Sequence, residues 1–96
     1  MKYYILDENG NPVIADIMEW AQWFDKHKYR IYNDTVGDSE ISTIFLGMYH
    51  SLGEPKLWET MVFGGKFDQM RVRCSGSLEQ AEAMHTRMVE MVKRSN

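Results

Sequence analysis

Apolar residues recur at helical spacing soon after a turn-rich segment near the start of the chain. Asp16 is a residue type that caps helices, and Glu19 follows three positions later, as in a capping box. Apolar residues then repeat at i, i+3, i+4 and i+7, at Ile17, Trp20, Ala21 and Phe24. This spacing predicts a helix over residues 16–28. Met18 and Trp23 widen the apolar stripe, so we expect the helix to cover a neighbouring loop or a second subunit as well.

A second helix is predicted at the end of the chain, over residues 77–94. Ser77 can cap it, and Gln80 stands three residues on. Its apolar stripe contains Leu78, Ala81, Met84, His85, Met88, Met91 and Val92. Most charged residues lie outside this stripe, so we expect one face of the helix to pack on the rest of the protein.

One run before the helices and four between them have the residue types of β-strands. They are residues 3–6, 29–36, 39–49, 57–63 and 66–74. Glycine-containing turns join the second run to the third and the fourth to the fifth, as in β-hairpins. The element order predicts an α+β fold. We expect one domain over residues 1–96, with a mostly antiparallel sheet of about five or six strands and two helices packed on it.

Charge and cysteine content exclude several classes of protein. The 96 residues carry a net charge of −3, whereas nucleic-acid binding usually needs a basic stripe. A local cluster of Lys66, Arg71 and Arg73 is best interpreted as a strand edge protected by charge. Cys74 is the single cysteine, so neither an internal disulfide nor a multi-cysteine zinc site is expected.

The hydropathy of the chain gives an expectation for its location. No apolar run approaches the roughly 18–20 residues of a membrane span. The N-terminus turns acidic at Asp7, too early for a signal peptide. We therefore expect a cytoplasmic protein with no membrane partner.

The sequence contains no local catalytic motif. It lacks a phosphate-binding glycine loop, a nucleophile elbow and a His-Glu-x-x-His pair, so we assign no catalytic residue, cofactor or metal. His50 ends a predicted strand and His85 lies on the last helix, so the fold could bring them to Glu59 and Thr60 in a ligand-binding site. The favoured interpretation of His85 is a buried polar group that fastens the helix to the sheet.

Methionine and aromatic residues are abundant for a chain of this length. Eight methionines and three tryptophans are present, and both residue types are used in binding surfaces. A small domain cannot easily bury all of them. We therefore expect a homo-oligomer or a protein partner, with Trp23, Trp58, Tyr49 and Met88 as interface candidates.

The segment from Ile41 to His50, followed by residues 57–63, resembles a group of small uncharacterised proteins encoded by bacteriophages and prophages. Their shared pattern is roughly S-T-V-W-L-G-x-D-H, then F-E-T-M-V-F, then a helix with E-A-x-x-G-H. A leading E-W-A-x-W-F also matches, at residues 19–24. Tyr49 stands where the pattern has Asp, and Met84 precedes His85 where the pattern has Gly.

The resemblance implies an accessory protein in the cytoplasm of the infected bacterium, and it brings no established activity. By analogy with small phage proteins, we expect non-catalytic binding of a host or phage protein, for example to antagonise a bacterial defence or a host enzyme. The alternative is a protein that sequesters a small ligand or nucleotide in a pocket near His50, Glu59 and His85. A hydrolase that uses the same groups is a third hypothesis.

Overall fold

The computed structural model describes residues 1–27, 30–50 and 52–95. Its helices are α1 (Ile17–Lys26) and α2 (Leu78–Arg94). Its strands are β1 (Lys2–Leu6), β2 (Pro12–Ala15), β3 (Arg30–Val36), β4 (Ser39–Phe45), β5 (Met48–Tyr49), β6 (Trp58–Phe63) and β7 (Arg71–Cys74). All of their pairings are antiparallel, which confirms the predicted α+β class. The predicted helix end at residue 28 and strand start at residue 29 lie outside the described residues.

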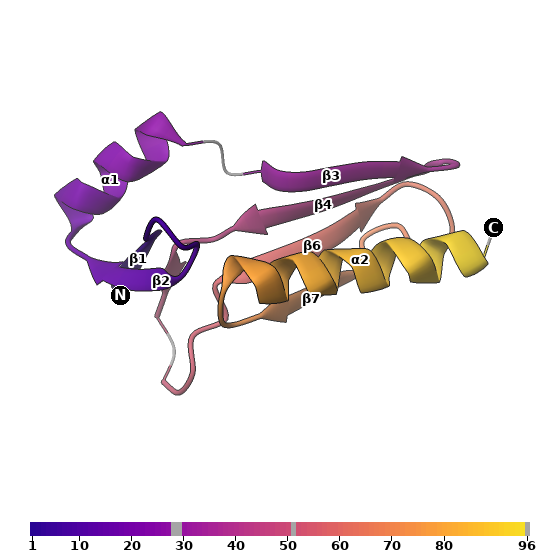
Figure 1. Cartoon of the computed structure of the whole chain (residues 1–96). Helices are drawn as coiled ribbons and strands as arrows, with labels where there is room; N and C mark the ends of the chain where they lie inside the picture. The colour runs from indigo at the N-terminus through magenta and orange to yellow at the C-terminus, as the bar shows by residue number, and fades with distance from the viewer. Residues whose placement is uncertain (28–29, 51, 96) are drawn as a thin grey trace.

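The described strands form two sheets where the sequence predicted one. Their orders are β2-β1-β5 and β3-β4-β6-β7. The three-stranded sheet and α1 lie at one end of the molecule, whereas α2 runs along the four-stranded sheet (Figure 1). The sequence prediction omitted β2, because Pro12 and its neighbours are turn formers. Proline is nevertheless tolerated as the first residue of an edge strand, which is its place here.

Both helices begin as their sequences predicted. Asp16 accepts a hydrogen bond from the backbone N–H of Glu19 at 2.8 Å. Ser77 accepts one from the backbone N–H of Gln80 at 3.4 Å. These caps satisfy N–H groups that have no partner within the helix, and so fix where each helix starts.

The predicted strand over residues 39–49 is interrupted at Gly47, between β4 and β5. Gly47 has a φ of 71°, in the left-handed region that favours glycine. A side chain at this position would overlap Phe24 and Trp20 of α1. The Gly47 carbonyl instead accepts a hydrogen bond from the N–H of Tyr4 in β1, at 2.8 Å. The chain therefore passes from one sheet to the other here, with α1 packed against the crossing point.

The predicted strand over residues 66–74 is also shorter in the structure, where β7 begins only at Arg71. The preceding residues form turns, in which Asp68 accepts a hydrogen bond from the N–H of Gly64 at 2.6 Å. Gln69 has a φ of 73°, which is incompatible with an extended strand.

The core lies between the four-stranded sheet and the helices. Strand alternation directs Ile41, Thr43 and Phe45 of β4 toward α2, together with Trp58, Thr60 and Val62 of β6. One buried cluster contains Phe24, Phe45, Leu57, Trp58, Ala81 and Met84, and a second contains Ile41, Val62, Met88, Val89 and Val92. Thr43 and Thr60 lie among these apolar neighbours, which places polar chemistry inside the core.

Candidate functional site

A buried polar network links the four-stranded sheet to α2. It consists of Asp34 on β3, Thr43 on β4, Thr60 on β6 and His85 on α2. Thr43 and Thr60 are direct cross-strand partners, so their side chains meet on the same face of the sheet. Asp34 pairs with Ile41 and shares that face, which puts its carboxylate within reach of the helix.

The distances in this network are those of hydrogen bonds. His85 Nε2 lies 2.7 Å from Asp34 Oδ2, and His85 Nδ1 lies 2.7 Å from Thr43 Oγ1. Thr43 Oγ1 is in turn hydrogen-bonded to Thr60 Oγ1. Both threonines are 0% exposed, whereas the side chain of Asp34 is 58% exposed. The network therefore runs from solvent at Asp34 into the interior.

The chemistry of the groups sets the direction of these hydrogen bonds. An ionised carboxylate only accepts, so Nε2 of His85 donates to Asp34. In a neutral imidazole Nδ1 then accepts from the hydroxyl of Thr43, which accepts from the hydroxyl of Thr60. No member of the network is left without a partner, which is the condition for burying polar groups at little cost.

A carboxylate, an imidazole and a hydroxyl in this order resemble the groups of a hydrolytic triad. A nucleophile, however, must reach the reacting atom of its substrate. Thr43 and Thr60 have no exposed surface, and α2 lies over them. In this fold the network is a fastener between helix and sheet, which is the role favoured for His85 from the sequence.

Tyr32 of β3 and Glu82 of α2 flank the network. The Tyr32 hydroxyl donates to Glu82 Oε2 at 3.1 Å, and its ring centroid lies 5.5 Å from that of His85. Partial burial raises the pKa of the Tyr32 hydroxyl, and the hydrogen bond to the charged Glu82 raises it further. The tyrosine is therefore a neutral donor that adds a second tie between β3 and α2.

The structure brings together only two of the four predicted ligand-binding residues. Thr60 and His85 meet through Thr43. Glu59 lies on the opposite face of the sheet, where its Oε2 accepts a hydrogen bond from Arg73 Nε at 2.7 Å. His50 is exposed after β5, in a hollow that Tyr4 and Tyr49 also line. The prediction of a pocket near His50, Glu59 and His85 is therefore corrected, because in the structure these side chains lie in three different surroundings.

Sequence reasoning missed the importance of Asp34 and Thr43. Thr43 has no base beside it in sequence. Its base, His85, lies 42 residues away in sequence. The signal in the sequence was the alternation of side chains along β3. It places Asp34 on the same face of the strand as Tyr32 and Val36.

Two of the four interface candidates belong to the core. Trp58 is fully buried, and its Nε1 donates to the carbonyl of Gly76 at 2.8 Å. Met88 is buried against Ile41 and Val62. Trp23 and Tyr49 are only partly buried, each against the first core cluster. The interface prediction is therefore corrected for Trp58, which has no surface to offer a partner.

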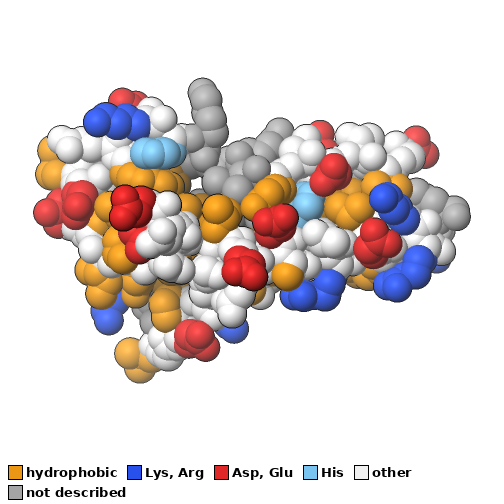
Figure 2. Space-filling model, in the orientation of Figure 1, with side chains coloured by type: hydrophobic (Ala, Val, Ile, Leu, Met, Phe, Trp, Pro, Cys, Tyr) orange, Lys and Arg blue, Asp and Glu red, His pale blue; other side chains and the backbone are white. Residues whose placement is uncertain are grey.

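A different group of apolar side chains is exposed. Ile14 is 69% exposed, Ile17 55% and Met18 67%. We call these three residues, at the end of β2 and the start of α1, the N-terminal patch. Figure 2 shows hydrophobic side chains gathered over this end of the molecule. The helical pattern had placed Ile17 on the inner face, but the inward-facing positions are held by Trp20 and Phe24.

No cluster of metal ligands among the described residues, and no similarity to known proteins, assigns a function to the site. Within residues 1–27, 30–50 and 52–95, no three metal-ligating side chains gather into a cluster. None of the helices formed by these residues is long and apolar enough to cross a bilayer. Comparison with protein-family models, curated proteins and solved structures finds no match to the chain.

Proposed function

We propose that this chain is a small phage- or prophage-encoded accessory protein that acts without catalysis, by binding a host or phage protein. The observation that supports binding is the N-terminal patch. Ile14, Ile17 and Met18 lie within five consecutive residues and are all more than half exposed. Contiguous exposed apolar side chains often mark a surface that another molecule covers.

The energetics of the patch support a protein partner. Removing apolar surface from water is worth roughly 25 cal/mol per Å². The side chains of the N-terminal patch stay in water after folding. The free energy of removing their apolar surface from water can therefore still be gained when a partner covers them. Isoleucine and methionine side chains offer no charge to orient a polar metabolite, whereas the core of a protein interface is depleted in charge.

The buried polar network supports a mode of action without catalysis. Its hydroxyls and imidazole are used in holding α2 on the sheet, and the threonines have no surface to offer a substrate. The phage assignment comes from the motif spanning residues 41–50 and 57–63. Antagonism of a bacterial defence or a host enzyme is the form of binding that we favour, since it needs only a stable complex.

Paired surface variants test this function. The tagged full chain is produced in bacteria, its bound protein is identified by mass spectrometry, and the complex is rebuilt from purified components. We expect Ile14→Asp combined with Met18→Asp to weaken binding by at least about tenfold, equivalent to 1.4 kcal/mol. Thr86→Asp, which puts one aspartate on an exposed position of α2, should bind like the wild type.

Two results would overturn the proposal. One is a rebuilt complex whose affinity is unchanged by the double variant at residues 14 and 18. The other is a stable homo-oligomer of the wild type, detected by light scattering, that the double variant at residues 14 and 18 dissociates, because the patch would then be closed to any other protein.

A further inference from the structure

The outer edge of β7 is available for an additional strand. β7 is the last strand of the order β3-β4-β6-β7. The carbonyls of Met70 and Cys74 accept hydrogen bonds from Val62 and Leu57, on the β6 side. Backbone groups alternate sides along a strand, so those of Arg71 and Arg73 point away from β6. An edge of this kind is a template for pairing with another chain.

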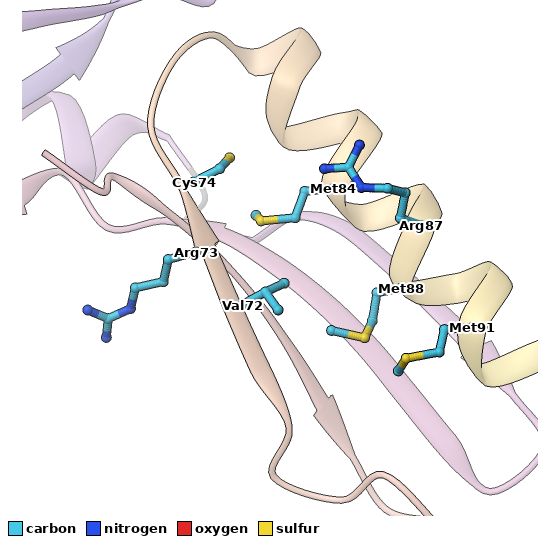
Figure 3. Close-up of a pocket in the computed structure, with 7 residues that line it drawn as sticks. All are labelled: Val72, Arg73, Cys74, Met84, Arg87, Met88 and Met91. Carbon is cyan, nitrogen blue, oxygen red and sulfur yellow. The ribbon is translucent and has the colours of Figure 1, made fainter. Parts of the chain in front are cut away.

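An apolar groove lies beside this edge, between β7 and α2. It has a volume of about 260 Å³, and its apolar walls are Val72, Met84, Met88 and Met91. Figure 3 shows Val72 on the side of β7 that faces the helix, whereas Arg73 points away from the helix. The groove is smaller than the roughly 300–1,000 Å³ of pockets for drug-sized ligands. Its size suits one or two aliphatic side chains of a bound segment, and methionine walls adapt to such side chains.

Positive charge surrounds the same edge. A second hollow, of about 380 Å³, adjoins the groove at Cys74 and Arg87 and is also lined by Lys56 and Arg73. Arg73 is paired with Glu59. Arg71, Arg87 and Lys56 have no acidic partner within 4.0 Å among the residues that the structure describes. Arg71, on the open face of the sheet, is therefore free to meet an acidic group of a ligand, while Arg87 and Lys56 keep the surroundings of the edge positive.

We propose that β7 binds an extended segment of a partner protein, in which acidic residues alternate with apolar ones, as an added antiparallel strand. Residues opposite Arg71 and Arg73 would share the open face of the sheet with these arginines and are acidic. Residues opposite Val72 and Cys74 would face α2 and are apolar, because they enter the methionine-walled groove. A segment in which acidic and apolar residues alternate would therefore place its acidic side chains beside the arginines and its apolar side chains in the groove.

Charge argues against a second copy of this chain as the occupant. Two β7 strands paired around a two-fold axis would place the arginines of one beside those of the other, and like charges opposite each other are destabilising. If β3 of a second copy were the added strand, its Asp34 would lie among the methionines, because Asp34 is on the face of the sheet toward α2. A separate acidic partner avoids both costs.

This inference extends the proposed function, because it adds a second binding surface distinct from the N-terminal patch. The two can fail independently. Strand addition at β7 requires no contact with residues 14–18, and docking on the N-terminal patch requires none with β7.

The test uses a fluorescent nine-residue peptide in which glutamate alternates with leucine, and the full chain. We expect saturable binding by fluorescence anisotropy. A lysine–leucine version should bind at least about tenfold more weakly, since the positive edge repels it. Methylating the backbone nitrogens of the glutamates, which would face β7, should also abolish binding. Methylating those of the leucines, which would face away, should preserve it.

Variants of the chain locate the site. Arg71→Glu should weaken peptide binding by about tenfold at low salt, with a smaller loss at high salt. Arg94→Glu, the same charge change at the exposed end of α2, should have no effect. Bound peptide should also slow alkylation of Cys74, which lies at the junction of the two hollows. The double variant at residues 14 and 18 should bind this peptide normally, which separates the two surfaces.

Several results would overturn strand addition at β7. They are the absence of saturable binding, equal binding of the two methylated peptides, and peptide-induced association of two copies of the chain. Tighter binding of a single-stranded oligonucleotide that competes with the peptide would assign the cations to phosphate groups instead. None of these results would affect docking on the N-terminal patch.

Discussion

The substitution Thr43→Val tests whether the buried polar network fastens α2 to the sheet. Valine has nearly the shape of threonine, so it leaves no cavity, but it removes Oγ1. This atom bonds both His85 Nδ1 and Thr60 Oγ1 in a region with no exposed surface. A buried polar group left without a partner costs about 1–3 kcal/mol. With two such groups, we expect a loss of about 2–6 kcal/mol in the free energy of unfolding.

This loss is large for a domain of 96 residues. Total stabilities are about 5–15 kcal/mol, and a domain of this size loses about 4–8 °C in melting temperature per kcal/mol. We therefore expect the melting temperature of Thr43→Val to fall by at least about 8 °C. Urea unfolding followed by tryptophan fluorescence measures the loss, with an unchanged m-value as the sign that both states keep their compactness.

Thr35→Val is the matched control. Thr35 is exposed on the same sheet and faces away from α2, so its substitution should change stability by less than about 0.5 kcal/mol. In a His85→Leu background, Thr43→Val should cost less than in the wild type, because only Thr60 then loses a partner. A cost for Thr43→Val below about 0.5 kcal/mol would refute the fastening role of the network.

Three further predictions follow from other contacts. Gly47→Ala should destabilise by about 2–4 kcal/mol in urea unfolding, because its methyl group overlaps Phe24 at a positive φ; a loss below about 0.5 kcal/mol would contradict this packing. Trp58→Phe should cost about 1–3 kcal/mol, because the Gly76 carbonyl loses its donor, and an unchanged melting temperature would contradict that bond. Burial raises the pKa of the Cys74 thiol, although nearby Arg87 and Lys56 oppose the shift; iodoacetamide at pH 8.5 should therefore alkylate the folded chain more slowly than the urea-unfolded chain, and equal rates would contradict this.

The raised pKa of Cys74 also gives a sign for the pH dependence of stability. The folded chain holds the thiol proton more tightly than the unfolded chain does. The contribution of this group is therefore fully present below the ordinary thiol pKa and is lost as the pH rises above it. Cys74→Ser should lose this alkaline dependence.

The parts of the fold that the sequence predicted are those fixed by neighbouring residues. Both helix starts depend on a cap and a backbone N–H three residues away. The hairpin of β3 and β4 depends on its glycine turn, where Gly37 has a φ of 58°. Such signals are contained in a few consecutive residues, so they can be recognised without knowing the tertiary structure.

The parts that could not be predicted depend on contacts between distant residues. Gly47 ends β4 because Phe24, 23 positions earlier, packs against it. His85 meets Asp34 across 51 positions, and Thr43 meets Thr60 only because of the register between β4 and β6. Trp58 was expected at an interface because tryptophan is common both in cores and in binding surfaces. Composition alone does not separate these two environments.

The most direct test of the central claim is a photo-crosslink from the N-terminal patch inside living bacteria. A photoreactive amino acid replaces Met18 in one form of the full chain and Thr86 in another. If the N-terminal patch docks a partner protein, the form labelled at residue 18 gives one recurring product with a different protein, and the form labelled at residue 86 does not. The account is contradicted if residue 18 gives no product beyond those that residue 86 also forms.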